Sequence, residues 1–411
     1  MGELENTELP WGPGKTALFR WFVIFSLAFI APLEPLTNLV IPWIGQTLLG
    51  IESEIGLEMT GSGDTTASYI RLLLHAVAAG IGTLAWTLIA GSRARYRRGL
   101  HWFTFALRLA VAMSMLLYGL AKIGEGQFAS PTDMRMLQSY GDSSPMGLLW
   151  TFMGHSKVYS SFTGMAEILG ALLLLSRRTT TLGALVVVGV MSNVVMLNFC
   201  YDVPVKLYSS RLLVWGLFLA ALDRHRLYAF FANAGGTQPR VLPPLYAKRR
   251  AHIAGIVAKV LTVMFVGGAV LVGPVLMRPE PPAATAEFVG TYAVVTVQRD
   301  DQEVPPLVTD DERWHRVVLS EHGVFTVFGT NGARSFYGAE FNPEAGTVEL
   351  SRRVPDQEER EVRSWGYAFD ADTRTLVLYE GRDRIEMKSF EPEFLLRDRG
   401  FHWIQEHPYN R

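Results

Sequence analysis

The sequence predicts an α-helical polytopic membrane bundle followed by a soluble all-β domain, a small barrel or a sandwich. Hydrophobic residues make up 49% of the 411 residues. The mean hydropathy is +0.18, which is high for a soluble protein. Apolar runs of about 17 to 25 residues, long enough to cross ~30 Å of hydrocarbon, recur up to residue 275. Beyond residue 287 they give way to short alternating runs typical of β-strands.

We expect about seven membrane spans, one for each apolar run. The runs cover residues 16–31, 68–90, 102–121, 158–175, 182–199, 209–222 and 252–275. Whether the first run spans fully stays open, because Pro32, Pro35 and Pro42 interrupt its continuation.

Loop charges predict the orientation of these spans. The basic clusters SRARYRRG, SRR, DRHRLY and YAKRR follow the second, fourth and sixth runs, whereas residues 51–64 contain acidic residues and no basic ones. Basic loops stay in the cytoplasm. Seven spans then give a cytoplasmic N-terminus and an extracytoplasmic C-terminal domain.

Ionisable side chains inside apolar spans are rare and usually functional. On this ground Lys122, Glu167, Asp202 and Lys206 are candidate catalytic residues at an outer-leaflet pocket. Polar residues on the same side are candidates for binding a ligand or cofactor: Gln127, Asn193, Asn198, Asp142 and His75. For His75 alone, a satisfied position between helices is the more common alternative.

We also expect Arg108 and Glu167 to form an ion pair. Counted from the ends of their runs at a rise of 1.5 Å per residue, both lie roughly 10 to 14 Å from the cytoplasmic edge. Such a pair either fixes helix packing or serves as a relay.

Small residues supply the packing and capping signals. Gly164, Gly170, Gly183 and Gly189 allow helix backbones to approach closely. In GSGDTT, Asp64 or Thr65 is expected to cap the second span.

The polar stretches also carry a family resemblance. The run YGLAKIGEGQF, then SYGDSSPMGLLWTFMG, the glutamate in FTGMAEILGALLLLSRRTT, and MSNVVMLNFCYDVPVK together resemble the DoxX-like membrane protein family. The resemblance covers roughly residues 64–223 and implies a four-helix core in a bacterial cytoplasmic (inner) membrane. Members of that family are linked to quinone-coupled sulfur oxidation, to thiol redox complexes and, in distant relatives, to receptor assembly.

The expected domains follow from these assignments. They are an N-terminal span with an outer loop (1–67), a DoxX-like core (68–223), a basic loop with the last span (224–278), and a periplasmic β-domain with an aromatic tail (279–411). The interior of a small barrel is usually filled by its own side chains, although a bound ligand is the alternative.

Several function classes are excluded or disfavoured. A net charge of -1 argues against nucleic acid as a partner. The single cysteine, Cys200, rules out an intrachain disulfide and a CxxC redox pair. Walker A, GxGxxG, HExxH and GxSxG signatures are absent from the sequence, and no metal site is expected.

The leading functional expectation is an oxidoreductase-complex component that holds a quinone or similar lipophilic redox partner in the outer-leaflet pocket. The sequence shows no electron carrier, so the quinone or a partner subunit would carry the electrons. The alternatives are a non-catalytic assembly or secretion factor, whose β-domain binds an envelope protein, and a transporter.

Overall fold

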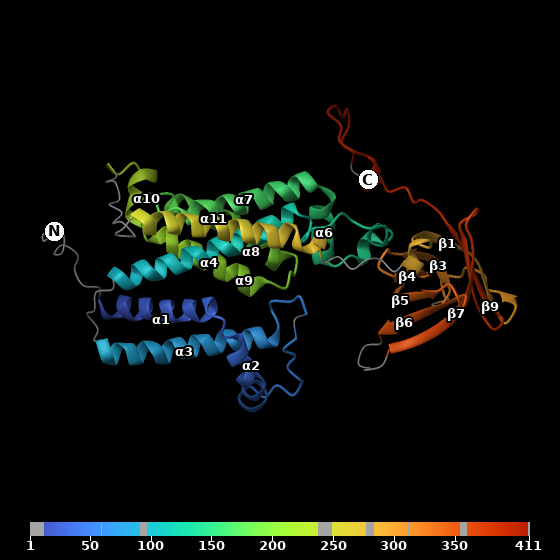
Figure 1. Ribbon diagram of the computed structural model, residues 1–411, viewed down its shortest axis with the longest axis horizontal. Helices are drawn as coiled ribbons and strands as arrows, with labels where there is room; N and C mark the ends of the chain where they lie inside the picture. The colour runs from blue at the N-terminus through green and yellow to red at the C-terminus, as the bar shows by residue number, and fades with distance from the viewer. Residues whose placement is uncertain are drawn as a thin grey trace. The chain divides into compact units, whose positions relative to one another are not determined.

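The protein divides into two compact units, each of which combines two stretches of the chain (Figure 1). The computed structural model describes residues 12–58, 60–90, 97–236, 249–276, 283–310, 312–353 and 360–409. The first unit comprises Met1–Gln127 and Val158–Gly273, and the second comprises Phe128–Lys157 and Pro274–Arg411. Much of the basic clusters at 92–99 and 246–250, and residues 277–282 before the β-domain, lie outside the described residues.

Within the described residues of the first unit, six helices are long and apolar enough to cross a membrane. They are α1 (Pro13–Ile30), α3 (Thr66–Ala90), α4 (Arg97–Ile123), α7 (Lys157–Leu175), α8 (Thr180–Cys200) and α11 (Arg249–Leu271). The remaining expected span is α9 (Lys206–Ala221), whose 16 residues extend about 24 Å. Seven helices therefore occupy the seven expected runs, and α9 is too short to cross the hydrocarbon alone.

The chain between α1 and α3 folds separately rather than continuing the first span. It forms α2 (Glu34–Trp43) and a π-helix (Ile44–Leu48). Ile41 of α2 forms a small apolar cluster with Ile55 of the following loop and with Ala67 and Ile70 at the start of α3. A short helix, α10 (Arg224–Phe231), follows α9, and α12 (Gly273–Leu276) follows α11.

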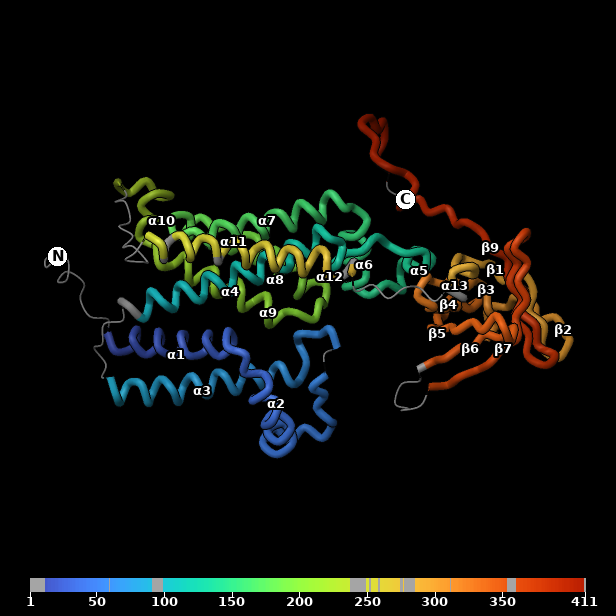
Figure 2. The backbone as a smooth tube through the Cα atoms, in the orientation of Figure 1, coloured from blue at the N-terminus to red at the C-terminus, as the bar shows by residue number. Residues whose placement is uncertain are grey.

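Helix α4 supplies much of the core of the first unit. Its residues Leu107, Val111, Ala112 and Met115 are almost fully buried. They pack with buried side chains of α1, α7, α8 and α9. Figure 2 shows α1 and α3 running side by side, and two hydrogen bonds join them, from Arg20 to Thr87 and from Trp21 to the carbonyl of Ala76.

Two glycines bring α4 and α7 into backbone contact. A Cβ added at Gly119 would lie 2.6 Å from the carbonyl oxygen of Gly164, and one added at Gly164 would lie 2.5 Å from that of Gly119. Larger side chains cannot fit at either position without separating the helices. Gly183 makes a similar contact with α7, whereas Gly189 has open space around it. The expected packing role holds for Gly164 and Gly183 and not for Gly189.

The β-domain is a closed antiparallel barrel rather than a sandwich. Eight strands follow one another in sequence order, and β1 pairs with β9 to close the sheet. The strands are β1 (Gly290–Arg299), β3 (Trp314–Leu319), β4 (Val324–Gly329), β5 (Arg334–Asn342), β6 (Thr347–Arg353), β7 (Arg360–Asp370), β8 (Thr375–Glu380) and β9 (Asp383–Ser389). The short strand β2 (Gln302–Glu303) pairs antiparallel with the end of β1.

Side chains fill most of the barrel interior, as expected for a barrel of this size. Phe288, which follows the short helix α13 (Ala283–Ala286), stacks on Phe341 with ring centroids 4.3 Å apart. A cavity of about 430 Å³ remains elsewhere in the barrel, with Trp314, Tyr337 and Trp365 in its wall and a charged rim.

Residues 128–157 pack with the barrel, although they were expected in the helical core. They form α5 (Asp133–Met136), a 3-10 turn (Tyr140–Asp142) and α6 (Pro145–His155). Asp133 accepts hydrogen bonds from Thr291 at 3.0 Å and from Arg397, in α14 (Leu395–Asp398), at 2.9 Å. The segment between α4 and α7 thus forms part of the second unit.

The glycine contact between α4 and α7 gives a direct test of the bundle packing. Gly119→Leu should destabilise the protein by about 1–3 kcal/mol or more, because the added side chain meets backbone that cannot move aside. Gly189→Leu is the matched control, since nothing lies within 4 Å of a Cβ at that position. Thermal unfolding of both purified variants is the measurement. Equal melting temperatures would contradict the assigned contact.

Candidate functional site

A buried ion pair joins α4 to α7. The Nζ atom of Lys122 lies 2.5 Å from Oε1 of Glu167, and the side chains are 7% and 3% exposed. Oε2 of Glu167 is buried without a hydrogen-bond partner in the described chain. The hydroxyl of Ser160 donates to the carbonyl of Lys122 at 3.4 Å. Two of the predicted catalytic residues therefore lie together, as a neutralised pair inside the helical unit.

The predicted pair between Arg108 and Glu167 is wrong. The glycine contact sets α4 and α7 antiparallel, so that Arg108 lies level with Leu174, two turns or about 10 Å beyond Glu167. The predicted depths depend on the ends of the apolar runs, which are not always the ends of the helices. Helix α4 begins at Arg97, before its apolar run starts at residue 102, whereas α7 ends at Leu175 together with its run. The start of α4 and the end of α7 therefore do not lie at the same depth.

Arg108 instead caps the end of α7. Its guanidinium donates twice to the carbonyl of Leu174, at 2.9 and 2.5 Å. Lys259 of α11 donates to the next carbonyl, Leu175, and Thr179 to that of Leu173. Carbonyls in the last turn of a helix have no partner within the helix, and cations suit that end of the helix dipole. The carbonyls at the end of α7, which lack partners within the helix, therefore explain why a charged residue, Arg108, occurs inside the apolar run of α4.

The predicted pair Asp202 and Lys206 forms, but at an exposed loop. Their charged atoms are 2.8 Å apart, and the Asp202 side chain is 83% exposed. A buried carboxylate from the neighbouring loop before α3, that of Asp64, accepts from the backbone amides of Lys206 at 2.7 Å and Leu207 at 3.0 Å. Asp64 thus caps α9, while Thr65 accepts from the Ser68 amide and caps α3, its expected role.

The other predicted ligand-binding residues do not converge. Asn198 is buried and donates to Ser209 at 3.0 Å. Asn193 is exposed on α8, and Asp142 is exposed in the second unit. Oε1 of Gln127 is buried without a partner in the described chain. Of this set only His75 borders the large cavity of the helical unit.

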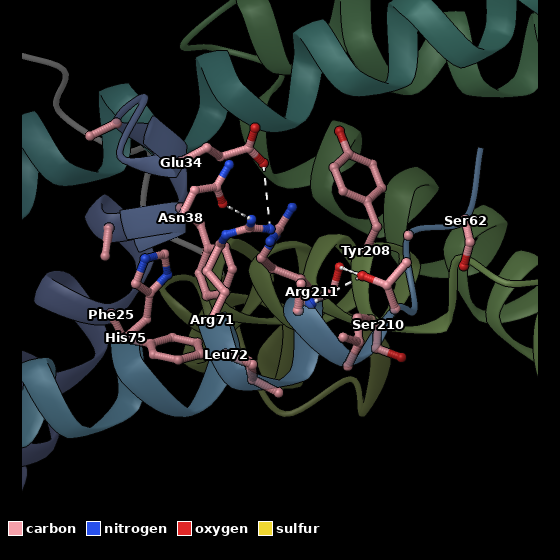
Figure 3. Close-up of a pocket in the computed structure, with 18 of the residues that line it drawn as sticks. Phe25, Glu34, Asn38, Ser62, Arg71, Leu72, His75, Tyr208, Ser210 and Arg211 are labelled. Carbon is pink, nitrogen blue, oxygen red and sulfur yellow. Dashed lines mark hydrogen bonds and ion pairs between the residues drawn. The ribbon is translucent and has the colours of Figure 1, made fainter. Parts of the chain in front are cut away.

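That cavity has a volume of about 690 Å³ and lies among α1, α2, α3 and α9 (Figure 3). Its polar lining comes from the ends of these helices and from the loop before α3: Glu34, Asn38, Glu58, Ser62, Thr65, Ser68, Arg71, Ser210 and Arg211. Its apolar lining reaches further along α1 and α9: Phe22, Phe25, Phe29, Val214 and Trp215. The cavity therefore changes from polar to apolar along the helix axes.

Arg71 of α3 is held in place by α2. Nη2 donates to Asn38 at 2.7 Å, and Nε donates to Thr37 at 3.1 Å. Nη1 lies 3.7 Å from the carboxylate of Glu34, whose side chain is 74% exposed. These contacts fix the guanidinium at the polar end of the cavity, as Figure 3 shows.

Arg211 of α9 is surrounded by aromatic rings. Its guanidinium carbon lies 4.3 Å from the ring centroid of Phe29, 4.8 Å from Tyr208 and 5.4 Å from Trp215. Nε is buried without a partner in the described chain. His75, edge-on to Phe29 at 4.4 Å, likewise has two buried ring nitrogens with no partner among the described residues.

Neither arginine of the cavity is among the site residues predicted from the sequence. Arg71 and Arg211 lie inside the predicted runs 68–90 and 209–222. They are therefore candidates for the same reason as Lys122 and Glu167, because ionisable residues inside apolar spans are rare and usually functional. What the sequence does not show is that α3 and α9, far apart in the chain, face the same cavity.

The buried pair predicts a non-additive mutant cycle. Glu167→Gln or Lys122→Met alone should cost about 3–5 kcal/mol of stability, because each leaves one charge buried without its partner. The double variant should recover part of this loss. Combining Arg108→Leu with Glu167→Gln should give additive losses, since Arg108 contacts Leu174 instead. Simple additivity between Lys122 and Glu167 in detergent unfolding would contradict the pair.

The capping assignment predicts opposite outcomes for two aspartates of neighbouring loops. Asp64→Ala should destabilise the protein by about 1–2 kcal/mol, because two amides at the start of α9 lose their acceptor. Asp202→Asn should change stability by less than about 0.5 kcal/mol, since exposed ion pairs contribute little. Melting temperatures measured side by side test this, and a larger loss for Asp202→Asn would reverse the assignment.

The comparisons with known proteins bear on the family alone. No family model matches the chain, and no solved structure matches it. Uncharacterized protein YwoB of Bacillus subtilis (strain 168) is 38% identical over 125 residues, which make up 30% of this chain and 79% of YwoB. At this identity and coverage, the chain belongs to the same family as YwoB.

Proposed function

We propose that this chain is an integral membrane protein that binds one lipid-soluble ligand, by its polar head, in the cavity among α1, α2, α3 and α9. The main support for this proposal is the lining of the cavity. Its volume is about 690 Å³, its walls include aromatic side chains, and two arginines and a histidine border it. Pockets of about 300–1,000 Å³ with apolar walls and a few convergent polar groups are typical of small-molecule sites.

The polarity gradient supports a ligand with one polar and one apolar end. Arg71 and His75 are one turn apart on α3, and Arg211 faces them from α9. Phe22, Phe25 and Val214 line the apolar remainder. A lipophilic molecule would place its polar head near the arginines and its tail along these side chains.

The redox version of this proposal makes the ligand a quinone and the chain a component of an oxidoreductase complex. The residues present fit such a molecule, because Arg71, Arg211 and His75 can donate hydrogen bonds to carbonyl oxygens and Phe29 and Trp215 offer flat apolar faces. A quinone would supply the electron chemistry. The chain's own part would be to bind and orient the ring. The DoxX-like resemblance in the sequence is consistent with this version.

The proposed location is the bacterial cytoplasmic membrane, with the barrel on the extracytoplasmic side. The six long apolar helices support a multi-pass protein. The basic clusters of the sequence support the orientation, because positively charged loops remain in the cytoplasm.

A cavity-filling substitution tests the binding function. Ser210→Trp should lower the amount of copurifying amphiphile at least several-fold, since the indole occupies the space near Arg211. Ser192→Trp, at an exposed position of α8 outside the cavity lining, is the matched control. Native mass spectrometry and extraction of the purified proteins measure bound ligand. Equal ligand content in the two variants would contradict the site.

A further inference from the structure

The charges around the cavity are separated by depth. Glu34 and Glu58, the two carboxylates of the lining, are both exposed, and Glu34 already faces Arg71 at 3.7 Å. Arg211 lies further along α9, among aromatic rings. Glu34 acts on Arg211 only from a distance, and among the described residues no carboxylate forms an ion pair with this guanidinium.

Arg211, which is partly buried, differs in this respect from two fully buried cations of the bundle. Lys122 has the carboxylate of Glu167, and Arg108 has the carbonyl of Leu174. The guanidinium of Arg211 has neither a hydrogen bond nor an ion pair within the described residues, and its Nε is one of their buried unsatisfied atoms. Its contacts are the rings of Phe29, Tyr208 and Trp215.

Ring contacts replace only part of the hydration that a partly buried guanidinium loses. A cation is attracted to an aromatic face, but a charge without a counter-ion inside a membrane bundle is costly. His75 adds a buried ring without a hydrogen-bond partner in the described chain. An acceptor-rich anion would satisfy both groups together.

We infer that the cavity recognises an anionic phosphate ester, the head group of a membrane phospholipid, through Arg211, Arg71 and His75. This deepens the proposed function and rests on it. A phosphate offers several oxygens to donors that approach from different sides, and the planar fork of arginine matches its geometry. The quinone of the redox version above would accept hydrogen bonds from these donors, but its neutral head would leave the charge of Arg211 uncompensated. A carboxylate holds its acceptor oxygens in one plane, whereas the tetrahedral oxygens of a phosphate suit donors that come from both α3 and α9.

The apolar half of the cavity argues for a lipid as the source of the phosphate. Phe22, Phe25 and Val214 continue from the arginines along the helix axes, where an acyl chain or glycerol backbone would lie. A soluble phosphate ester would leave these side chains uncovered. Binding should therefore require both the anion and the chains.

The experiment titrates the full-length protein, in detergent, with four probes and measures 1:1 complexes by native mass spectrometry. The probes are phosphatidylglycerol, diacylglycerol with the same chains, a menaquinone and glycerol 1-phosphate. Phosphatidylglycerol should bind at least about tenfold more tightly than diacylglycerol, which lacks only the charged head, because charge-assisted hydrogen bonds contribute strongly in a low-dielectric site. The menaquinone and glycerol 1-phosphate should bind more weakly than the phospholipid.

Matched variants connect this preference to Arg211. Arg211→Gln should reduce phosphatidylglycerol affinity about tenfold or more, and Arg211→Lys should restore part of it. Arg178→Gln removes the same charge from an exposed loop position outside the cavity lining and should leave affinity unchanged. The comparison of lipids on the wild-type protein remains decisive even if Arg211→Gln does not fold.

The outcomes separate this inference from the proposed function. Equal binding of diacylglycerol and phosphatidylglycerol, or preference for the menaquinone, overturns the phosphate assignment while leaving a lipophilic site intact. Tight binding of glycerol 1-phosphate without lipid overturns the lipid source. Absence of any 1:1 ligand, together with unchanged copurification in Ser210→Trp, overturns the proposed function itself.

Discussion

The close contact of Gly119 with Gly164 determines how the polar groups of the bundle are arranged. With no side chain at either position, the backbones of α4 and α7 meet and the register of the two helices is set. That register places Lys122 within reach of Glu167 and Arg108 at the end of α7. The buried charges of Lys122, Glu167 and Arg108 then each have a partner already in place. A shift of one helix by one turn would separate Lys122 from Glu167 and Arg108 from the carbonyl of Leu174.

The interface of α4 and α7 differs from the cavity among α1, α2, α3 and α9, where the charge of Arg211 forms no ion pair with the described residues. Along α4 and α7, charge meets carboxylate or carbonyl, whereas along α9 the Arg211 charge meets aromatic faces and a hollow space. Proteins keep charges at membrane depth where they pair or face a cavity. The contrast distinguishes groups that hold the bundle together, such as Arg108, from groups available to a ligand. Burial alone does not make this distinction, since Lys122 and His75 are both almost fully buried.

Much of the fold follows from the sequence, because hydrocarbon thickness and strand alternation leave local patterns. The apolar runs, the barrel alternative and the roles of Lys122 and Glu167 as buried residues belong to this part. The partner of Glu167 does not, since a helix end counted from hydropathy misses the extension of α4 to Arg97. Nor does the cavity, because Arg71 and Arg211 meet only through tertiary packing. The attachment of residues 128–157 to the barrel likewise depends on long-range contacts such as Asp133 with Thr291.

The closure of the barrel limits how the second unit can recognise another protein. Pairing of β1 with β9 gives both terminal strands of the ladder a neighbour, so among the described strands only the two-residue β2 ends the sheet at an edge. An extended peptide joins a sheet by hydrogen bonding to an unpaired edge. A protein partner of this barrel would therefore bind to side chains on the barrel's outer surface or charged rim. The partner's backbone would not join the hydrogen-bonded ladder of the sheet. The same closure leaves no long unpaired strand among the described strands to serve as a template for strand-to-strand aggregation.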